Sequence, residues 1–180
     1  MKKYLVTYAS ETGNTLKLAQ EIHNAINCPK DDKSLVDIRT WNGTLDAELY
    51  FIGFWINRGS CSLEIIDLIS SLHGKNVAFF GTCGLGDSYE YHKMLEQNAR
   101  AWLADDNNYL GAYFCLGKMR REIREKYEDM RGKCADYQID SMLERFDNSA
   151  EHPDNQDLLQ VRLFTDEILV KAENYTAAYV

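Results

Sequence analysis

The chain has 180 residues, and its 28 Asp and Glu outnumber its 20 Lys and Arg, which gives a formal net charge of −8 at pH 7. With 45% hydrophobic residues, a domain of this length can bury a sizeable core without disulfides or a structural metal. The acidic balance disfavours nucleic acid as a partner, because binding to phosphates needs clustered Lys and Arg. We therefore expect a single domain over residues 1–180 that binds no nucleic acid.

The N-terminal segment becomes polar at Ser10, too early for the apolar region of a signal peptide. The longest apolar stretch, residues 49–56, is far shorter than the roughly 20 residues of a membrane span. No C-x-x-C pair occurs among the five cysteines, so neither a zinc site nor a dithiol redox motif is indicated. We expect a cytoplasmic protein with free thiols, no metal site and no membrane span.

Short apolar runs alternate with segments in which apolar residues recur at helical spacing. The runs, expected to be strands, span residues 3–8, 34–38, 48–54, 75–81 and 109–117. Helices are expected around residues 16–26, 63–72, 94–103 and 157–171. This alternation predicts an α/β fold, a doubly wound five-stranded parallel sheet with helices on both faces. Such a sheet binds ligands at the carboxyl ends of its strands, so the loops after the first, third and fourth strands matter most.

The first of these loops combines hydroxyls, an amide and a glycine where a helix is expected to begin. Unpaired backbone N–H groups and the helix dipole attract a phosphate at such a position. A nucleoside-triphosphate loop would need Gly-Lys-Ser/Thr, which the sequence lacks. The alternative is that Ser10 or Thr12 only caps the helix. The candidate phosphate-binding residues are Ser10, Glu11, Thr12, Gly13, Asn14 and Thr15.

The second loop follows an aromatic-rich strand and offers a stacking surface for a planar heterocycle, with Trp55 the expected stacking residue. The alternative is that Phe54 and Trp55 simply complete the core. The candidates here are Phe54, Trp55, Ile56, Asn57, Arg58 and Gly59. A cation at Arg58 near the ligand would stabilise an anionic form of it, whereas a solvated surface arginine is the other interpretation.

The third loop is rich in glycine, which gives flexible backbone and exposed N–H groups. It does not match a dinucleotide fingerprint, because Tyr89 stands where the third glycine or alanine is required. A glycine-rich turn without a ligand is the alternative. The candidates are Thr82, Cys83, Gly84, Leu85, Gly86, Asp87, Tyr89 and Tyr91.

Together the three loops resemble those of the flavodoxin family. Residues 10–15 match its [ST]-x-T-G-N-T phosphate loop at every defined position, and the resemblance extends from residue 3 to about 118, with a weaker return at 152–154 and in the closing helix. The resemblance implies the strand order 2-1-3-4-5 and an FMN cofactor, with its phosphate at residues 10–15 and its ring between Trp55 and Tyr89.

The resemblance further implies a low-potential electron carrier between a reductase and an acceptor redox enzyme, with no catalytic residue of its own. Neutral donors around the phosphate would place little positive charge near the flavin, and Gly59 or the peptides around Asn57 are candidates to contact the reacting edge of its ring. The alternative is a small FMN-dependent reductase or oxidase of a flat, quinone- or porphyrin-like substrate on the same fold.

Residues 118–152 are an insertion relative to a minimal flavodoxin and are rich in basic residues over 118–133. Helical spacing predicts a helix there with one buried stripe, formed by Met119, Ile123, Tyr127 and Met130. Such a helix would cover the mouth of the flavin site or dock a partner, or it would be a solvated helix packed on the sheet edge, which is the interpretation we prefer.

Overall fold

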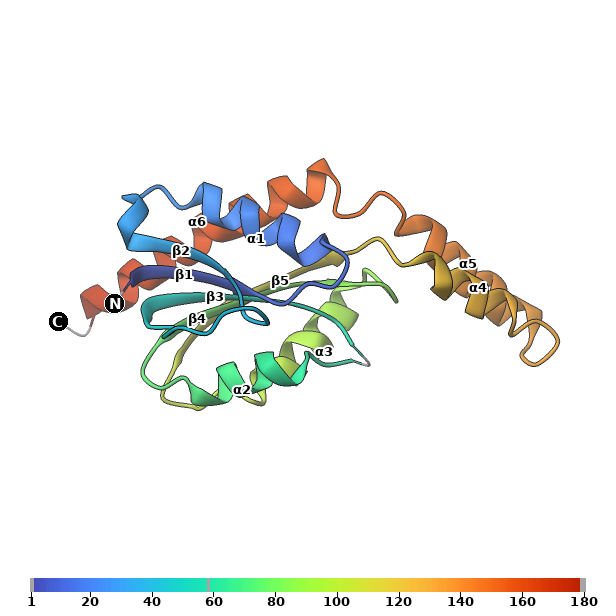
Figure 1. Ribbon diagram of the computed structural model, residues 1–180, viewed down its shortest axis with the longest axis horizontal. Coiled ribbons are helices and arrows are strands. Elements are labelled where there is room, and N and C mark those ends of the chain that lie inside the picture. The colour runs from blue at the N-terminus through green and yellow to red at the C-terminus, as the bar shows by residue number, and fades with distance from the viewer. Residues whose placement is uncertain (1, 58, 179–180) are drawn as a thin grey trace.

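The computed structural model describes residues 2–57 and 59–178. Its strands are β1 (Lys2–Tyr8), β2 (Lys33–Asp37), β3 (Ala47–Trp55), β4 (Asn76–Cys83) and β5 (Asn108–Leu116). They form one parallel sheet in the order β2-β1-β3-β4-β5. The predicted fold class and strand order are confirmed, and each predicted strand overlaps an observed one (Figure 1).

Helices cover both faces of the sheet. Figure 1 shows α1 and α6 on one face and α2 and α3 on the other. The helices are α1 (Asn14–Ala25), α2 (Leu63–Ser71), α3 (Tyr89–Arg100), α4 (Arg121–Glu128), α5 (Asp136–Asn148) and α6 (Asn155–Ala178), with a short 3-10 turn at Lys30–Asp32. Among the described residues, none of these helices is long and apolar enough to cross a membrane.

Helix α3 begins five residues before the first apolar position from which it was predicted. The Oγ of Ser88 accepts a hydrogen bond of 3.2 Å from the backbone N–H of Tyr91 and so caps the helix. Tyr89 and Tyr91 consequently lie in the first helical turn, whereas the sequence placed them in a loop.

The central strands β3 and β4 are mostly apolar because both faces of the sheet are buried there. On the α2–α3 face, Phe54 packs edge-to-face against Phe79 and Phe114, with ring centroids 6.0 and 5.8 Å apart. On the other face, Phe51 and Phe80 belong to the cluster that α1 and α6 complete. These two clusters hold the carboxyl ends of the strands at fixed positions.

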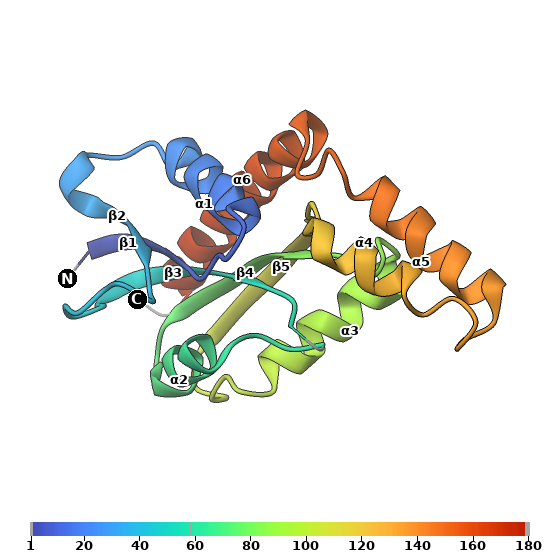
Figure 2. The same ribbon diagram turned by 45° about the vertical axis from the view of Figure 1, so that its right-hand side comes forward.

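The insertion folds as two helices, α4 and α5, which we call the α4–α5 hairpin (residues 121–148). Figures 1 and 2 show it extending past the carboxyl ends of the strands and away from the sheet. The expected packing on the sheet edge is therefore wrong. The stripe of α4 is only half-buried, and the helix packs on α5, whose Ile139 and Leu143 are buried. An ion pair between Arg124 and Asp147 links the two helices, and Arg131 in the loop between them pairs with Asp140 at 2.8 Å.

Candidate functional site

A cavity of about 260 Å³ lies at the carboxyl ends of β1, β3, β4 and β5. It brings together segments of the three loops that the sequence singled out, because parallel strands end at one edge of the sheet. The start of the insertion provides a further wall. The lining residues are Glu11, Thr12, Asn14, Trp55, Ile56, Thr82, Cys83, Gly84, Leu85, Gly117, Lys118, Met119, Arg120, Ile123 and Tyr127.

The first loop leads directly into the N-terminus of α1. Gly13, with φ of 85°, is the N-cap residue, so neither Ser10 nor Thr12 occupies the capping position that the alternative interpretation gave them. The Oγ of Ser10 accepts a hydrogen bond of 3.1 Å from the N–H of Gly13, which leaves its own hydroxyl hydrogen free to donate. A 12-residue helix with free terminal N–H groups beside hydroxyl donors suits a phosphate.

Two residues of this loop are held by other parts of the chain. The hydroxyls of Thr15 and Thr82 are 3.2 Å apart, so Thr15 ties the first loop to the end of β4. The carboxylate of Glu11 pairs with Arg120 at 2.8 Å, which brings a cation of the insertion next to the phosphate loop. The phosphate loop is therefore not surrounded by neutral donors alone.

In the second loop, the two aromatic residues have different positions. Phe54 is fully buried in the core, as the alternative interpretation held for it, whereas Trp55 is half-buried and lines the cavity with Ile56. Asn57 and Ser60 exchange backbone hydrogen bonds in a tight turn that contains Gly59. The carbonyl oxygen of Gly59 accepts a hydrogen bond of 2.9 Å from Nδ2 of Asn98. Neither Asn57 nor Gly59 lines the cavity, and Arg58 lies outside the described residues.

The third loop contributes its first half to the cavity. Thr82, Cys83, Gly84 and Leu85 line it, whereas Gly86, Asp87, Tyr89 and Tyr91 do not. Tyr89 is 72% exposed in the first turn of α3. The expectation that the flavin ring lies between Trp55 and Tyr89 stays a prediction, and of these two residues only Trp55 lines the cavity.

Cys83 lies in the cavity wall as a buried thiol. Burial raises its pKa to about 12, so it stays protonated at neutral pH. Its Sγ lies 3.2 Å from the carbonyl oxygen of Gly86 and 3.3 Å from that of Cys115. Beside it, Nε2 of His92 is 3.7 Å from this sulfur and 3.3 Å from Asp87, and burial lowers the pKa of His92. The thiol is in a structural setting rather than a reactive one.

Several residues of the insertion line the cavity, although the sequence did not predict them as cofactor-binding residues. Met119, Ile123 and Tyr127 line the cavity together with Arg120. Their spacing of four was visible in the sequence, where it predicted a packing stripe. Spacing shows that such residues share a helix face, but it does not show which surface that face meets.

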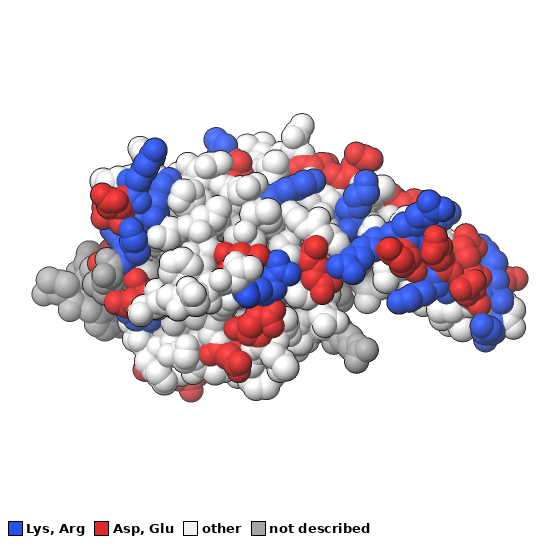
Figure 3. Space-filling view, viewed as in Figure 1, with Lys and Arg blue, Asp and Glu red and all other residues white. Residues whose placement is uncertain are grey.

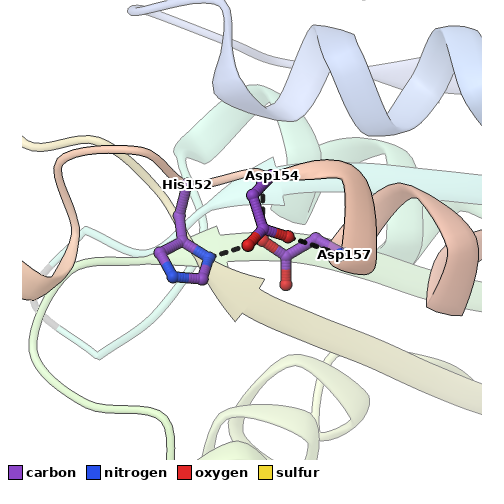
Figure 4. Close-up of side chains that lie close together, drawn as sticks. All are labelled: His152, Asp154 and Asp157. Carbon is purple, nitrogen blue, oxygen red and sulfur yellow. Dashed lines mark hydrogen bonds and ion pairs between the residues drawn. The ribbon is translucent and has the colours of Figure 1, made fainter.

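A second cluster of polar side chains lies outside the cavity, where the chain enters α6 (Figure 4). Among the described residues, His152, Asp154 and Asp157 bring potential metal-ligand atoms within 4.8 Å of one another. Hydrogen bonds account for the cluster: Nδ1 of His152 lies 2.6 Å from Asp157, and Asp154 accepts from the N–H groups of Gln156 and Asp157. We interpret the cluster as the N-terminal cap of α6, not as a metal site.

The fold and the cavity define a nucleotide-type cofactor site with a phosphate position at a helix N-terminus and an aromatic ring position at Trp55. A family model described as a flavodoxin domain matches residues 5–166. The chain therefore belongs to the flavodoxin family.

Curated relatives agree with this assignment over nearly the whole chain. A protein named flavodoxin-like domain-containing protein BilS from Clostridioides difficile (strain CD3) is 30% identical over 174 residues, which cover 94% of this chain and 98% of the relative. The protein of the same name from Clostridium symbiosum (strain WAL-14163) is 26% identical over 178 residues, covering 90% of this chain and 93% of the relative.

Solved structures share the fold at low identity. An archaeal flavodoxin matches with a TM-score of 0.57 and 16% identity, covering 95% of this chain and 99% of its own. A short-chain flavodoxin associated with a bacterial microcompartment matches with a TM-score of 0.59 and 13% identity, covering 96% and 99%. Both matches show that these proteins share the fold of this chain.

FMN is the cofactor of this protein, and the residues that line the cavity fit it. The N-terminus of α1 with the Ser10 hydroxyl suits the phosphate, and Trp55 lies in the same cavity at a position suited to the ring. When bound, FMN supplies one- and two-electron redox chemistry. The chain supplies binding, orientation and the charges around the cofactor.

Proposed function

We propose that this protein carries electrons at low potential between a reductase and an acceptor redox enzyme in the cytoplasm. The size of the cavity carries the proposal. At about 260 Å³ it lies below the roughly 300–1,000 Å³ of typical ligand pockets, which favours a site for the cofactor alone over one that also takes a flat substrate. A redox cofactor bound without a dedicated substrate pocket would exchange electrons with other proteins.

The charge of the protein supports this role. A net charge of −8 steers the protein toward basic surfaces in weak, salt-sensitive encounters, as electron exchange requires. The same excess of negative charge disfavours an anionic reduced flavin and so lowers the potential. Figure 3 shows that acidic and basic side chains both gather over the α4–α5 hairpin.

One observation favours a second candidate, an FMN-dependent reductase or oxidase of a flat substrate. The insertion adds an apolar wall to the cavity through Met119, Ile123 and Tyr127. If the hairpin moves outward, this wall would shape a substrate pocket above the flavin. In that case the protein would consume reduced nicotinamide nucleotide without a partner.

Stepwise anaerobic reduction of the FMN-loaded protein tests the proposal. For a carrier we expect a long-wavelength absorption band near the midpoint, which marks one-electron-reduced flavin, and no oxidation of NADH or NADPH by the protein alone. Direct bleaching without that band, together with unaided NAD(P)H oxidation, would replace the carrier with the second candidate. If the protein does not bind FMN, both candidates fail.

A further inference from the structure

We infer that the start of the insertion, residues 118–128, forms part of the FMN site: α4 provides a stacking wall for the flavin ring through Tyr127, and Arg120, just before α4, offsets the charge of Glu11 beside the flavin phosphate. The inference rests on the FMN site of the proposed function and does not depend on electron carriage. According to this inference, the cofactor site includes residues of the insertion as well as residues of the three loops.

The apolar face of α4 meets the cavity. Ile123 and Tyr127 lie one turn apart on α4, Met119 lies one turn before them, and all three are half-buried lining residues. The other face of α4 is polar and exposed, with Glu122, Glu125 and Lys126. The apolar face of the helix therefore lines the same cavity as Trp55.

Contacts at the base of the hairpin fix this orientation. The carbonyl oxygen of Lys118 accepts a hydrogen bond of 2.9 Å from Nδ2 of Asn14. The backbone N–H of Lys118 donates a hydrogen bond of 2.8 Å to the carbonyl oxygen of His152. The N–H of Met119 donates to Oγ of the fully buried Ser149 at 3.3 Å. Because the backbone is held on both sides, α4 starts from a defined point above the phosphate loop.

Glycine at position 84 allows the insertion to approach closely. A Cβ atom at Gly84 would lie 3.0 Å from Cγ and Sδ of Met119, so any side chain there would push Met119 outward. Met119 thus packs directly on the third loop of the cofactor site. The insertion and the loop form one continuous wall.

The aromatic residue suited to oppose Trp55 is Tyr127. It shares the cavity with Trp55, whereas Tyr89 is 72% exposed and does not line it. Aromatic rings stack on a planar ligand with more free energy than their buried area alone provides. Tyr127 thereby supplies the second stacking surface that the sequence assigned to Tyr89.

The insertion adds positive charge next to the phosphate loop. Glu11 is an anion within the phosphate loop and would repel a phosphate dianion. Arg120 pairs with it at 2.8 Å, and a second opening beside the loop is lined by Lys118, Arg120 and Arg121 together with Thr12. The insertion therefore makes the phosphate loop more favourable to an anion than its own residues do.

The ring contact is tested by titrating apoprotein with FMN and with riboflavin, using quenching of flavin fluorescence. For Tyr127→Ala we expect about threefold to tenfold weaker binding of both flavins. Tyr127→Phe keeps the ring and restores the affinity. The matched control is Tyr137→Ala, an aromatic residue of the same hairpin that is 73% exposed and away from the cavity.

The phosphate contact separates the two flavins, because riboflavin has no phosphate. We expect Arg120→Gln to weaken FMN binding by about twofold to fivefold and to leave riboflavin binding unchanged. The double variant Glu11→Gln, Arg120→Gln removes the unpaired anion and recovers FMN affinity. Raising the salt concentration should reduce the difference between wild type and Arg120→Gln.

Three outcomes decide the inference. It holds if Tyr127→Ala weakens both flavins while Arg120→Gln weakens only FMN, with far-ultraviolet circular dichroism unchanged. It is overturned if wild-type protein binds FMN and Tyr127→Ala behaves as Tyr137→Ala does, or if Arg120→Gln affects both flavins equally. Failure of the wild type to bind FMN would instead reject the FMN site itself, so the two failures are distinguishable.

Discussion

The side-chain amide of Asn14 donates a hydrogen bond of 2.9 Å to the carbonyl oxygen of Lys118, 104 positions further along the chain. Asn14 is the first residue of α1, and Lys118 begins the insertion. This contact joins the phosphate loop to the base of the α4–α5 hairpin. The side chain of this phosphate-loop asparagine therefore has a structural role, because one of its N–H groups donates to the backbone of the insertion.

Replacing Asn14 should therefore lower stability. Because Asn14→Ala leaves the Lys118 carbonyl without its partner in a partly buried position, we expect the free energy of unfolding to fall by about 1–2 kcal/mol in urea titrations. Asn24→Ala, an exposed change in the same helix, is the matched control and should stay near the wild-type value. Equal midpoints for the two variants would contradict the structural role of Asn14.

Trp55 should dominate binding of the flavin ring. Since Trp55→Ala removes a large aromatic surface from the cavity, we expect FMN affinity to fall about tenfold in fluorescence titrations. Trp102→Ala is the control, because Trp102 is 47% exposed and lies outside the cavity. An unchanged affinity in Trp55→Ala would place the ring elsewhere.

A side chain at position 81 should disrupt the sheet. A Cβ atom at Gly81 would lie 2.5 Å from the backbone carbonyl oxygen of Phe54, so β3 and β4 would have to separate. We expect Gly81→Ala to destabilise the protein by about 2 kcal/mol or more. At Gly86 the nearest atom is 3.6 Å from such a Cβ, so Gly86→Ala should cost far less in the same urea titration.

Buried thiols should make the protein sensitive to alkali. Burial raises the pKa of Cys83 to about 12 from its usual 9.0, so above about pH 9 the unfolded chain loses the proton while the folded protein retains it. The stability that this thiol contributes is complete below about pH 9 and is lost as the pH rises toward 12.

Urea midpoints measured from about pH 8 to about pH 10.5 check this sign. We expect the wild-type midpoint to decline over that range and the Cys83→Ala midpoint to decline less steeply. Cys134→Ala, a half-buried position, serves as the matched control. The slope does not vanish in Cys83→Ala, because burial also raises the pKa of Cys115 and Tyr109.

The fold could be predicted because the central strands are apolar on both faces and apolar residues recur at helical spacing between the strands. Runs such as residues 48–54 have no solvated face, which requires a covered parallel sheet. Helix ends were less well predicted. The capping serine at position 88 was treated as part of a glycine-rich loop, so the start of α3 and the orientation of Tyr89 were missed.

The site could be predicted where a ligand-facing residue follows a strand directly. Trp55, Thr82 and Glu11 line one cavity because the carboxyl ends of the strands converge, and their contact with the cofactor stays a prediction. Phe54 was a candidate for the same reason, but alternation along the strand turns it into the core. The contribution of Tyr127 depends on the direction in which the insertion leaves the sheet, and local sequence carries no signal for that direction.

The chain leaves the sheet for the hairpin and returns to it at a single point, where the N–H of Lys118 donates to the carbonyl of His152. The two ends of the insertion are therefore hydrogen-bonded neighbours, and its length places no constraint on β5 or α6. An opening of the hairpin that keeps this hydrogen bond would leave the sheet folded. A change in the length of the segment would change the cover of the cofactor without displacing β5 or α6.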